Sequence, residues 1–347
     1  MKYRTLITIL TLAAALWFGG MVRAEELLGA GATFPEPLYS KMFDVYYSQT
    51  SHKINYQGIG SGGGIQQITG QTVDFGGTDA FLTDGQMAKV QGNSLLHIPT
   101  ALGAVVVTYN LPGKPVLKLT PDVVAGIFLG RIKTWNDSRI TALNPGVNLP
   151  GDPVVVVHRS DGSGTSFVFT DYLSKVSPEW KQQVGAGTAV KWPVGLGGKG
   201  NPGVAGLVQQ MKSSVGYVEL AYAEKNRMPY AIIKNKSGNF IKPSIKSVSL
   251  AANVTLPDDT RASITDTDAK EGYPISAFTW ILVYKEQSYG GRTNSKAKTL
   301  AKLLWWMTHE GQQYCAELLY APLPKEAVAK AEKILKSVTY NGQPILK

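Results

Sequence analysis

Cysteine and histidine are scarce in this sequence of 347 residues, which has one cysteine, Cys315, and four histidines. A single cysteine cannot form an intrachain disulfide, and it excludes a zinc module built on several cysteine ligands. The histidines are too scattered to show metal-ligand spacing, so we expect no metal ion and no cofactor. The chain is long enough to bury a large core without such cross-links.

Charge is also limited, because 17% of the residues are charged while 44% are hydrophobic. These proportions are typical of a folded globular protein and exclude a disordered chain, a coiled coil and a collagen. The balance is basic, with 35 Lys and Arg against 25 Asp and Glu, and a formal net charge of +10. A basic protein can bind nucleic acid, acidic lipids or small anions, and net charge alone does not choose among them.

Only the N-terminus carries a long apolar run, from Leu6 to Phe18. Lys2 and Arg4 precede it, and Val22-Arg23-Ala24 follows it with small residues at the positions that a signal peptidase reads. The run is short for a membrane span, and this order disfavours the alternative of a buried N-terminal helix. We therefore predict that residues 1–24 form a cleaved export signal, whose removal would lower the net charge from +10 to +7.

Short segments rich in β-branched or aromatic residues alternate with stretches in which apolar residues recur at helical spacing. This alternation predicts an α/β fold. The predicted strands are Ile54 to Gln57, Val105 to Tyr109, Val154 to His158 and Ile281 to Tyr284. The predicted helices run from Leu38 to Tyr46, Val168 to Val176, Val204 to Met211 and Leu300 to Met307. The polar residues 255–271 are expected to form a surface excursion rather than a domain linker.

Three segments combine glycine with serine or threonine at the expected start of a helix: residues 29–35, 58–64 and 161–166. Glycine lets the backbone approach a ligand, and the free N–H groups of a helix start, together with the hydroxyls, donate to an anion. One such segment is more often a simple N-cap. Three in one exported chain, one of them preceded by Arg159, favour an oxyanion site. Asn201-Pro202 is interpreted as a helix N-cap followed by a first-turn proline, and His158 as a structural residue.

Five ordered motifs resemble those of the periplasmic phosphate-binding proteins of high-affinity phosphate ABC transporters. They are Gly-Ala-Gly-Ala-Thr-Phe-Pro at 29–35, Asn-Tyr-Gln-Gly-Ile-Gly-Ser at 55–61, Val-Asp-Phe-Gly-Gly-Thr-Asp at 73–79, Arg-Ser-Asp-Gly-Ser-Gly-Thr-Ser-Phe at 159–167 and Lys-Trp-Pro-Val-Gly-Leu-Gly-Gly-Lys-Gly-Asn at 191–201. The resemblance implies a two-lobed periplasmic binding protein of a type II-like fold, with a mixed sheet flanked by helices in each lobe and phosphate in the cleft between them.

The resemblance also implies the ligand set. The implied phosphate-binding residues are Ala32, Thr33, Phe34, Ser61, Asp79, Arg159, Ser163, Gly164 and Thr165, with Asp161 supporting Arg159. The family pattern after the second segment is Ser-Ser-Gly-Gly, whereas here Gly62 follows Ser61, so one hydroxyl of the pattern is absent.

The same resemblance implies that residues 25–110 and 284–347 form lobe I and that residues 111–283 form lobe II. Hinge crossings are expected near Asn110 and from Ile281 to Tyr284. A monomer that closes on inorganic phosphate and delivers it to the permease and ATPase complex of a transporter is implied, with no catalysis and no nucleic acid.

Asp79 is the informative residue of this set. An ionised carboxylate only accepts hydrogen bonds, so it suits an anion only where the anion carries a proton. Phosphate keeps a proton at neutral pH and sulfate keeps none, so Asp79 is expected to accept from phosphate and to repel sulfate.

Two alternatives stay open on the residues alone. One is an exported phosphatase with Ser61 or Ser163 as nucleophile, although the sequence shows no evident base or metal set for it. The other is a basic nucleic-acid-binding module, although the basic residues are dispersed rather than clustered with aromatic residues.

Overall fold

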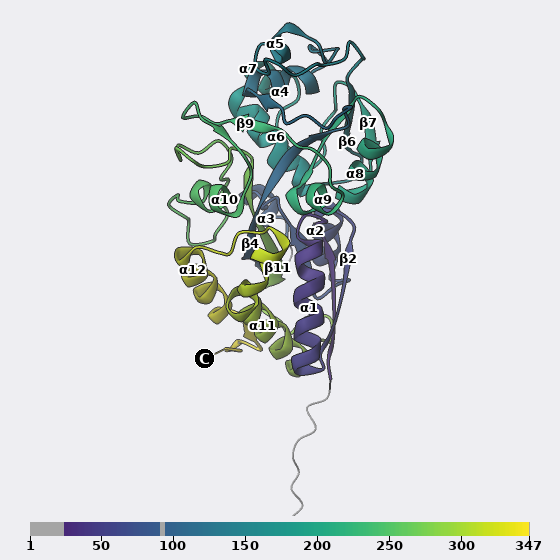
Figure 1. The fold of residues 1–347 in the computed structure, drawn as a ribbon. Helices are drawn as coiled ribbons and strands as arrows, with labels where there is room; N and C mark the ends of the chain where they lie inside the picture. Colours follow the sequence, from purple (N-terminus) through teal and green to yellow (C-terminus); the bar gives the residue numbers. More distant parts are fainter. Residues whose placement is uncertain (1–23, 91–93, 347) are drawn as a thin grey trace, which may run out of the picture.

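The computed structural model describes residues 24–90 and 94–346, so all but the last residue of the predicted export signal lies outside the described residues. The chain builds an elongated two-lobed α/β protein (Figure 1) around an eight-stranded mixed sheet of order β2-β1-β3-β11-β4-β8-β6-β7. The predicted α/β class is thereby confirmed.

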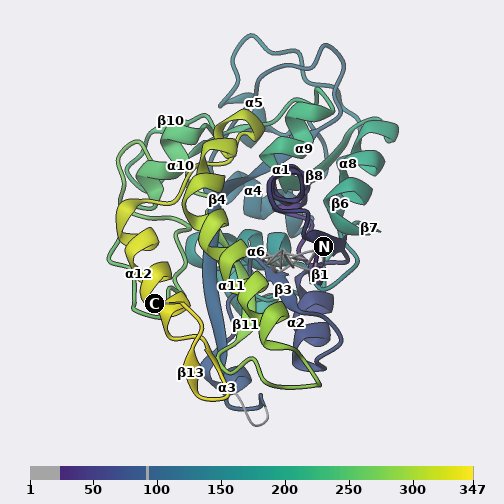
Figure 2. The ribbon, with the colours of Figure 1, turned by 90° about the horizontal axis from the view of Figure 1, so that it is seen from below.

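The first lobe, at the lower end of Figure 1, contains the beginning and the end of the described chain. Its strands are β1 (Glu26–Gly31), β2 (Lys53–Gly58), β3 (Phe75–Thr78), β11 (Ser276–Tyr284), the first part of β4 (Leu95–Tyr109), and the short β12 (Thr339–Tyr340) and β13 (Gln343–Pro344). Its helices are α1 (Glu36–Thr50), α2 (Ser61–Thr69), α3 (Asp84–Met87), α11 (Asn294–Thr308) and α12 (Lys325–Lys336), with 3-10 turns at Glu310–Tyr314 and Ala316–Leu318. Helices α11 and α12 lie side by side on this lobe (Figure 2).

The second lobe holds the middle of the chain. Its strands are the last part of β4, β8 (Ser214–Glu219), β6 (Val155–Arg159) and β7 (Leu196–Gly198), with a small sheet of β5 (Lys118–Leu119), β9 (Ile232–Lys234) and β10 (Phe240–Ile241). Its helices are α4 (Pro121–Phe128), α5 (Ser138–Thr141), α6 (Gly164–Val176), α7 (Pro178–Gln183), α8 (Gly200–Gln210), α9 (Leu220–Lys225) and α10 (Ile245–Ala251). Within residues 24–90 and 94–346, no helix combines the length and the apolar character needed to cross a membrane.

The four predicted strands and four predicted helices are confirmed as β2, β4, β6 and β11 and as α1, α6, α8 and α11, although β6 begins one residue after Val154 and α8 ends one residue before Met211. The helical spacing works as expected in α1, where Leu38, Tyr39, Met42, Phe43 and Tyr46 are buried on one side. Cys315 is also buried. Periodicity therefore identified both the elements and their inward faces.

Strand β4 belongs to both lobes. Its Ala104 pairs with Ser276 of β11, and the next residue, Val105, pairs with Glu219 of β8. Strand pairing thus divides the sheet between Ala104 and Val105 and keeps the whole of β11 with the first lobe. The lobe boundaries expected at residues 110 and 284 concern motion and stay a prediction.

The segment between α10 and β11 is the second connection between the lobes, and it includes residues 255–271. It is not simply a surface excursion, because Leu256, Thr260 and Ile264 are buried. The Thr260 hydroxyl donates to the His97 carbonyl at 2.9 Å in the first lobe. The Lys175 ammonium of α6 donates at 2.8 Å to the Thr265 hydroxyl. The sequence-based expectation was wrong here, because scattered polar residues concealed contacts with both lobes.

Parallel pairing brings the ends of several strands together. In the first lobe, β1, β2 and β3 are parallel, so their carboxyl ends meet at one edge of the sheet. In the second lobe, β6 is parallel to both β7 and β8. The two edges meet where the Gly62 N–H donates to the Gly162 carbonyl at 2.8 Å. Carboxyl edges of this kind are where open α/β sheets bind ligands, and all of the predicted site segments follow these strands.

Close packing of α2 on the sheet generates a stability prediction. A Cβ on Gly64 would lie 2.6 Å from the Gly31 Cα and 2.8 Å from the Ala30 and Gly77 carbonyl oxygens. These backbone atoms cannot rotate away, so Gly64→Ala is expected to destabilise the protein by about 1–3 kcal/mol in urea unfolding.

The matched control is a second helical glycine, Gly206 of α8, where an added Cβ meets nothing within 4 Å. Gly206→Ala is expected to stabilise the protein by about 0.4–1 kcal/mol, because alanine restricts the unfolded chain. Equal effects of the two substitutions would contradict this account of α2.

Candidate functional site

The loop after β1 presents backbone donors at the lobe boundary. Ala32 is bonded within its own lobe, since its N–H donates to the Gly77 carbonyl at 2.9 Å and its carbonyl accepts from the Tyr56 hydroxyl at 2.8 Å. By contrast, the N–H groups of Thr33 and Phe34 have no acceptor among the described residues. Ala32 therefore positions the loop, and the next two residues offer free donors.

Ser61 and Asp79 lie side by side at the ends of the neighbouring strands. Ser61 begins α2 after Gly60, whose φ of +88° is accessible to glycine. Its hydroxyl is buried and accepts from the Asp79 N–H at 3.2 Å, which leaves the hydroxyl proton available to donate.

The Asp79 carboxyl is buried, with 2% of the residue exposed. Oδ1 accepts from the Thr279 hydroxyl at 2.8 Å, next to a β-bulge in β11, whereas Oδ2 has no hydrogen-bond partner among the described residues. Burial raises the pKa of this carboxyl to about 7, although the Thr279 hydrogen bond and the Arg159 charge act in the opposite direction. Asp79 thus holds a buried acceptor atom that a proton or a protonated ligand could satisfy.

Arg159 ends β6 and is held by Asp161, as the sequence predicted. Its Nε donates to Asp161 Oδ1 at 2.8 Å and its Nη2 to Oδ2 at 2.5 Å, so the pair is bidentate. The Gly200 N–H adds a third bond to Oδ1 at 3.0 Å. Burial alone would raise the Asp161 pKa, but these hydrogen bonds and the Arg159 charge bring it below its ordinary value. The guanidinium is therefore fixed, with Nη1 directed at the Thr165 hydroxyl at 3.3 Å.

The start of α6 supplies further donors. Ser163 is the N-cap, and its hydroxyl accepts from the Ser166 N–H at 2.9 Å. The N–H groups of Gly164 and Thr165 have no acceptor among the described residues, as expected of a helix start. A Cβ on Gly164 would collide with the Ser61 hydroxyl and the Asp79 carboxyl. Glycine is needed here because the two lobes approach so closely.

Asn201 is the most important residue that the sequence analysis misjudged. It is not an N-cap, because α8 begins at Gly200 with Lys199 as its N-cap. Its side chain is fully buried, and Nδ2 donates at 3.0 Å to the hydroxyl of Thr33 and at 3.0 Å to that of Thr165. The only sequence signal for a role of Asn201 was its place as the last residue of the fifth motif. The spacing of polar residues cannot show contacts between lobes.

Two buried tyrosines also join the lobes, and neither was predicted. The Tyr222 hydroxyl of α9 donates to the Thr33 carbonyl at 2.6 Å. The Tyr320 hydroxyl of the first lobe donates to the Phe34 carbonyl at 2.6 Å and contacts Glu219 Oε2 of the second at 3.1 Å. Burial raises the pKa of the Glu219 carboxyl well above its usual range, although the hydrogen bonds from the Ala221 N–H and the Tyr320 hydroxyl act in the opposite direction. The two lobes are therefore in direct contact at this boundary.

The structure brings the predicted site residues together at the lobe boundary. Gly164 lies against Ser61 and Asp79, and Asn201 links Thr33 to Thr165, which in turn contacts Arg159. Donors thus come from both lobes, and the Asp79 carboxyl is the acceptor among them. This set of groups suits a small oxyanion that carries a proton.

A hydrolase would need a base beside its nucleophile. The hydroxyls of Ser61 and Ser163 instead accept from backbone N–H groups, and neither bonds a histidine or lysine among the described residues. His158 stacks on Trp192 with ring centroids 4.9 Å apart, which confirms its structural role. Within the part of the chain that the structure describes, no group of three or more His, Cys, Asp or Glu side chains could hold a metal ion.

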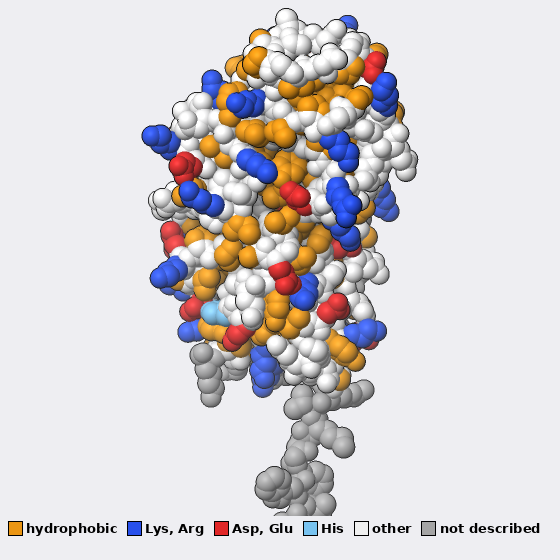
Figure 3. All heavy atoms as spheres, viewed as in Figure 1, with side chains coloured by type: hydrophobic (Ala, Val, Ile, Leu, Met, Phe, Trp, Pro, Cys, Tyr) orange, Lys and Arg blue, Asp and Glu red, His pale blue; other side chains and the backbone are white. Residues whose placement is uncertain are grey.

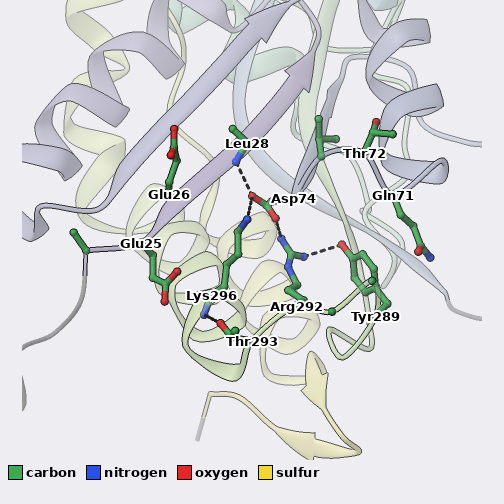
Figure 4. Close-up of a pocket in the computed structure, with 14 residues that line it drawn as sticks. Glu25, Glu26, Leu28, Gln71, Thr72, Asp74, Tyr289, Arg292, Thr293 and Lys296 are labelled. Carbon is green, nitrogen blue, oxygen red and sulfur yellow. Dashed lines mark hydrogen bonds and ion pairs between the residues drawn. The ribbon is translucent and has the colours of Figure 1, made fainter.

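A charged pocket separate from the candidate site lies at the amino ends of β1 and β3 (Figure 4). There Asp74 accepts from the Leu28 N–H at 2.6 Å and from Lys296 at 3.0 Å, and it also pairs with Arg292. Arg292 donates to the Tyr289 hydroxyl at 2.7 Å. Because the cations are already paired with Asp74, this cluster anchors the start of α11 to the sheet and does not compete as an anion site.

The basic charge of the protein is not concentrated on the face shown in Figure 3, where Lys and Arg are interspersed with Asp and Glu. Several cations of the protein are also paired, as in Arg131 with Glu179 at 2.7 Å. This distribution does not favour a continuous nucleic-acid track over that face.

Burial of Asp79 predicts a pH dependence of stability. A carboxyl whose folded pKa is raised to about 7 contributes stability below its unfolded pKa and loses it as pH rises through the folded pKa. Asp79→Asn is therefore expected to match the wild type near pH 4 and to be more stable by about 1–4 kcal/mol near pH 8, measured by urea unfolding without ligand.

Asp137→Asn provides a control of opposite sign. Hydrogen bonds from Arg139 lower the pKa of Asp137 to about 2, so its contribution is present above the unfolded pKa and disappears as pH falls through the folded one. This variant should be less stable than the wild type at neutral pH, with the difference shrinking in acid. A pH-independent difference for Asp79→Asn would overturn the description of its burial.

Comparison with known proteins agrees with this geometry. Residues 22–310 match the model of the PBP superfamily domain. The chain is 44% identical over 320 residues to the phosphate-binding protein PstS of Pasteurella multocida, covering 91% of each protein. It is 43% identical over 312 residues to the PstS protein of Haemophilus influenzae, covering 88% of this chain and 91% of that one.

The fold also matches a Clostridium perfringens protein assigned as a phosphate ABC transporter substrate-binding protein, whose crystal structure contains phosphate. The TM-score is 0.63 at 17% identity, covering 86% of this chain and 100% of the other. Both the family model and the sequence relatives span most of the chain. The chain therefore belongs to the PBP superfamily and, within it, to the family of PstS phosphate-binding proteins.

Proposed function

We propose that this protein binds one inorganic phosphate between its lobes and delivers it to the membrane permease of a phosphate ABC transporter. The observation that carries the proposal is the buried Asp79 Oδ2 without a partner among the described residues, placed against the donor groups of the second lobe. The names of the relatives, which are phosphate-binding proteins, support the same ligand.

The proposed ligand groups divide into donors and one acceptor. The donors are the Thr33 hydroxyl, the Thr33 and Phe34 N–H groups flanked by Ala32, the Ser61 hydroxyl, the Arg159 guanidinium supported by Asp161, the Ser163 hydroxyl, and the Gly164 and Thr165 groups at the start of α6. The proposed acceptor is Asp79. Most of these donors are neutral, so they satisfy phosphate oxygens without placing further full charges in a buried site.

Asp79 would provide the discrimination between phosphate and sulfate. Its Oδ2 accepts a hydrogen bond from a protonated ligand oxygen, and the ligand thereby replaces the missing partner. Sulfate has no proton at neutral pH and would face the carboxylate oxygen without a hydrogen bond between them. The resulting repulsion in a buried site disfavours sulfate strongly.

Closure would complete the site, because the donors belong to different lobes. We place the flexible connections at β4 near Ala104 and Val105 and in the segment before β11, where the chain passes between the lobes. In the open form Thr33 would separate from Asn201 and Tyr222. The closed form is then the one that a permease and its ATPase would distinguish.

This function requires no chemistry on the ligand, in agreement with the relatives, which are named as binding proteins rather than as hydrolases. A monomer is sufficient, because one chain supplies both walls of the site. We place the mature protein in the periplasm, after cleavage of the predicted signal at residues 1–24.

Calorimetric titration of the ligand-stripped mature protein tests the proposal. Wild type is expected to bind one phosphate and to ignore sulfate. Asp79→Asn should bind sulfate at least about 10-fold more tightly than wild type does, because an amide can donate where the carboxylate only repels, and phosphate should lose about 10- to 100-fold in affinity.

Asp137→Asn, in an exposed ion pair with Arg139, should leave both titrations unchanged. Absence of phosphate binding by folded wild-type protein would refute the proposed function. Unchanged selectivity in Asp79→Asn would refute the role of the carboxylate while leaving the receptor function in place.

A further inference from the structure

The orientation of the buried Asn201 amide is fixed by its neighbours. Its Oδ1 accepts from the Glu219 N–H at 2.9 Å, a group that can only donate. The Nδ2 must then face the two threonine hydroxyls, Thr33 in the first lobe and Thr165 in the second, at 3.0 Å from each. One side chain therefore contacts both lobes with a defined direction of hydrogen bonding.

This direction determines where the threonine protons point. A hydroxyl oxygen has two acceptor lone pairs and one proton. Thr33 Oγ1 accepts from both the backbone N–H and the Nδ2 of Asn201, each at 3.0 Å. Thr165 Oγ1 accepts from Arg159 Nη1 at 3.3 Å and from Asn201 Nδ2. With both lone pairs occupied, each hydroxyl can act further only as a donor.

No acceptor among the described residues receives either of these protons. Thr165 lies in the first turn of α6, next to the free N–H groups that point out of the helix start. The two protons are therefore left for a ligand at the lobe boundary.

We propose that Asn201 is a positioning residue that joins the closed lobes and makes the hydroxyls of Thr33 and Thr165 donate to the bound anion. The inference rests on the proposed phosphate-binding function and deepens it. Thr33 receives both of its bonds from the other lobe, so its hydroxyl is fixed as a donor only when the lobes are closed. Closure and ligand recognition thus depend on the same amide group.

The decisive variant is Asn201→Asp, which keeps the shape of the side chain and replaces the donor group with an acceptor. The ionised carboxylate of this variant would attract the protons of Thr33 and Thr165 away from the anion and would also repel it. Phosphate affinity at about pH 8 is expected to fall by about 100-fold or more. As pH falls and the new carboxyl is protonated, it regains a donor, so the ratio of wild-type to variant affinity should shrink.

Asn235 offers a matched control in the second lobe, away from the site. It is also buried, and its Nδ2 donates to the carbonyls of Ala269, Lys270 and Gly272 at 3.1–3.2 Å. Asn235→Asp introduces the same change into a structural turn. It should lower stability in urea unfolding while the remaining folded protein binds phosphate with wild-type affinity and pH profile.

A double-mutant cycle tests the route through the hydroxyls, and it also decides the matter if Asn201→Asp fails to fold. Asn201→Ala should weaken phosphate binding by about 10-fold in wild type but by less than about 2-fold when Thr33→Val and Thr165→Val are already present. Equal losses in the two backgrounds would overturn the inference.

The outcomes separate the two proposals. Failure of folded wild type to bind phosphate refutes the proposed function itself. Phosphate binding by wild type, with unchanged affinity and pH profile in Asn201→Asp, refutes only the role of Asn201. Loss of affinity at about pH 8 that recovers in acid, together with coupling to the two threonines, supports it.

Discussion

A buried anion must have its oxygen atoms satisfied by donors that are already oriented, because water no longer reaches them and unpaired polar atoms are costly. This constraint explains why the site residues hold one another in place by hydrogen bonds. The Ser61 hydroxyl accepts from a backbone N–H, Ser163 does the same, and Asp161 fixes the Arg159 guanidinium. Each of these contacts leaves a donor directed outward. Asp79 is the exception, because its Oδ2 lacks a partner within the described protein and burial raises the pKa of the carboxyl to about 7.

The fold supplies these groups through strand direction. Parallel pairing of β1, β2 and β3 places three loops at one edge, and β6, β7 and β8 do the same in the other lobe. Strand β4 runs from the first-lobe part of the sheet into the second-lobe part, so it helps to hold the two edges opposite each other. A long strand resists bending within each sheet but has no common partner where it changes from β11 to β8. This change of partner strand is the reason for placing the proposed hinge at Ala104 and Val105.

Sequence reasoning succeeded where the signal is local. Apolar spacing identified α1 and α6, and glycine with hydroxyl residues after strands identified the loops that carry Thr33, Ser61 and Ser163. The Arg159–Asp161 pair was also accessible, because only one residue lies between its members. Contacts between lobes were not accessible. Asn201 is 168 residues from Thr33, and Tyr320 is 101 residues from Glu219, so no periodicity relates them. The burial of Thr260 was missed for the same reason, since its partner, the carbonyl of His97, belongs to a distant strand.

How strongly the ligand favours closure depends on which of its contacts are made by one lobe and which need both lobes. A ligand shifts a two-state equilibrium only by its difference in affinity for the two states. Bonds made to groups of a single lobe exist in both states and contribute little to that difference. Bonds that need both lobes contribute fully, and the Thr33 hydroxyl is such a group, because Asn201 orients it only on closure. Because the Asn201 amide orients a donor of the other lobe, the ligand binds the closed form more tightly than the open form and so favours closure. A receptor whose donors were all fixed within one lobe would bind its anion equally well while open, and a permease would have no closed form to recognise.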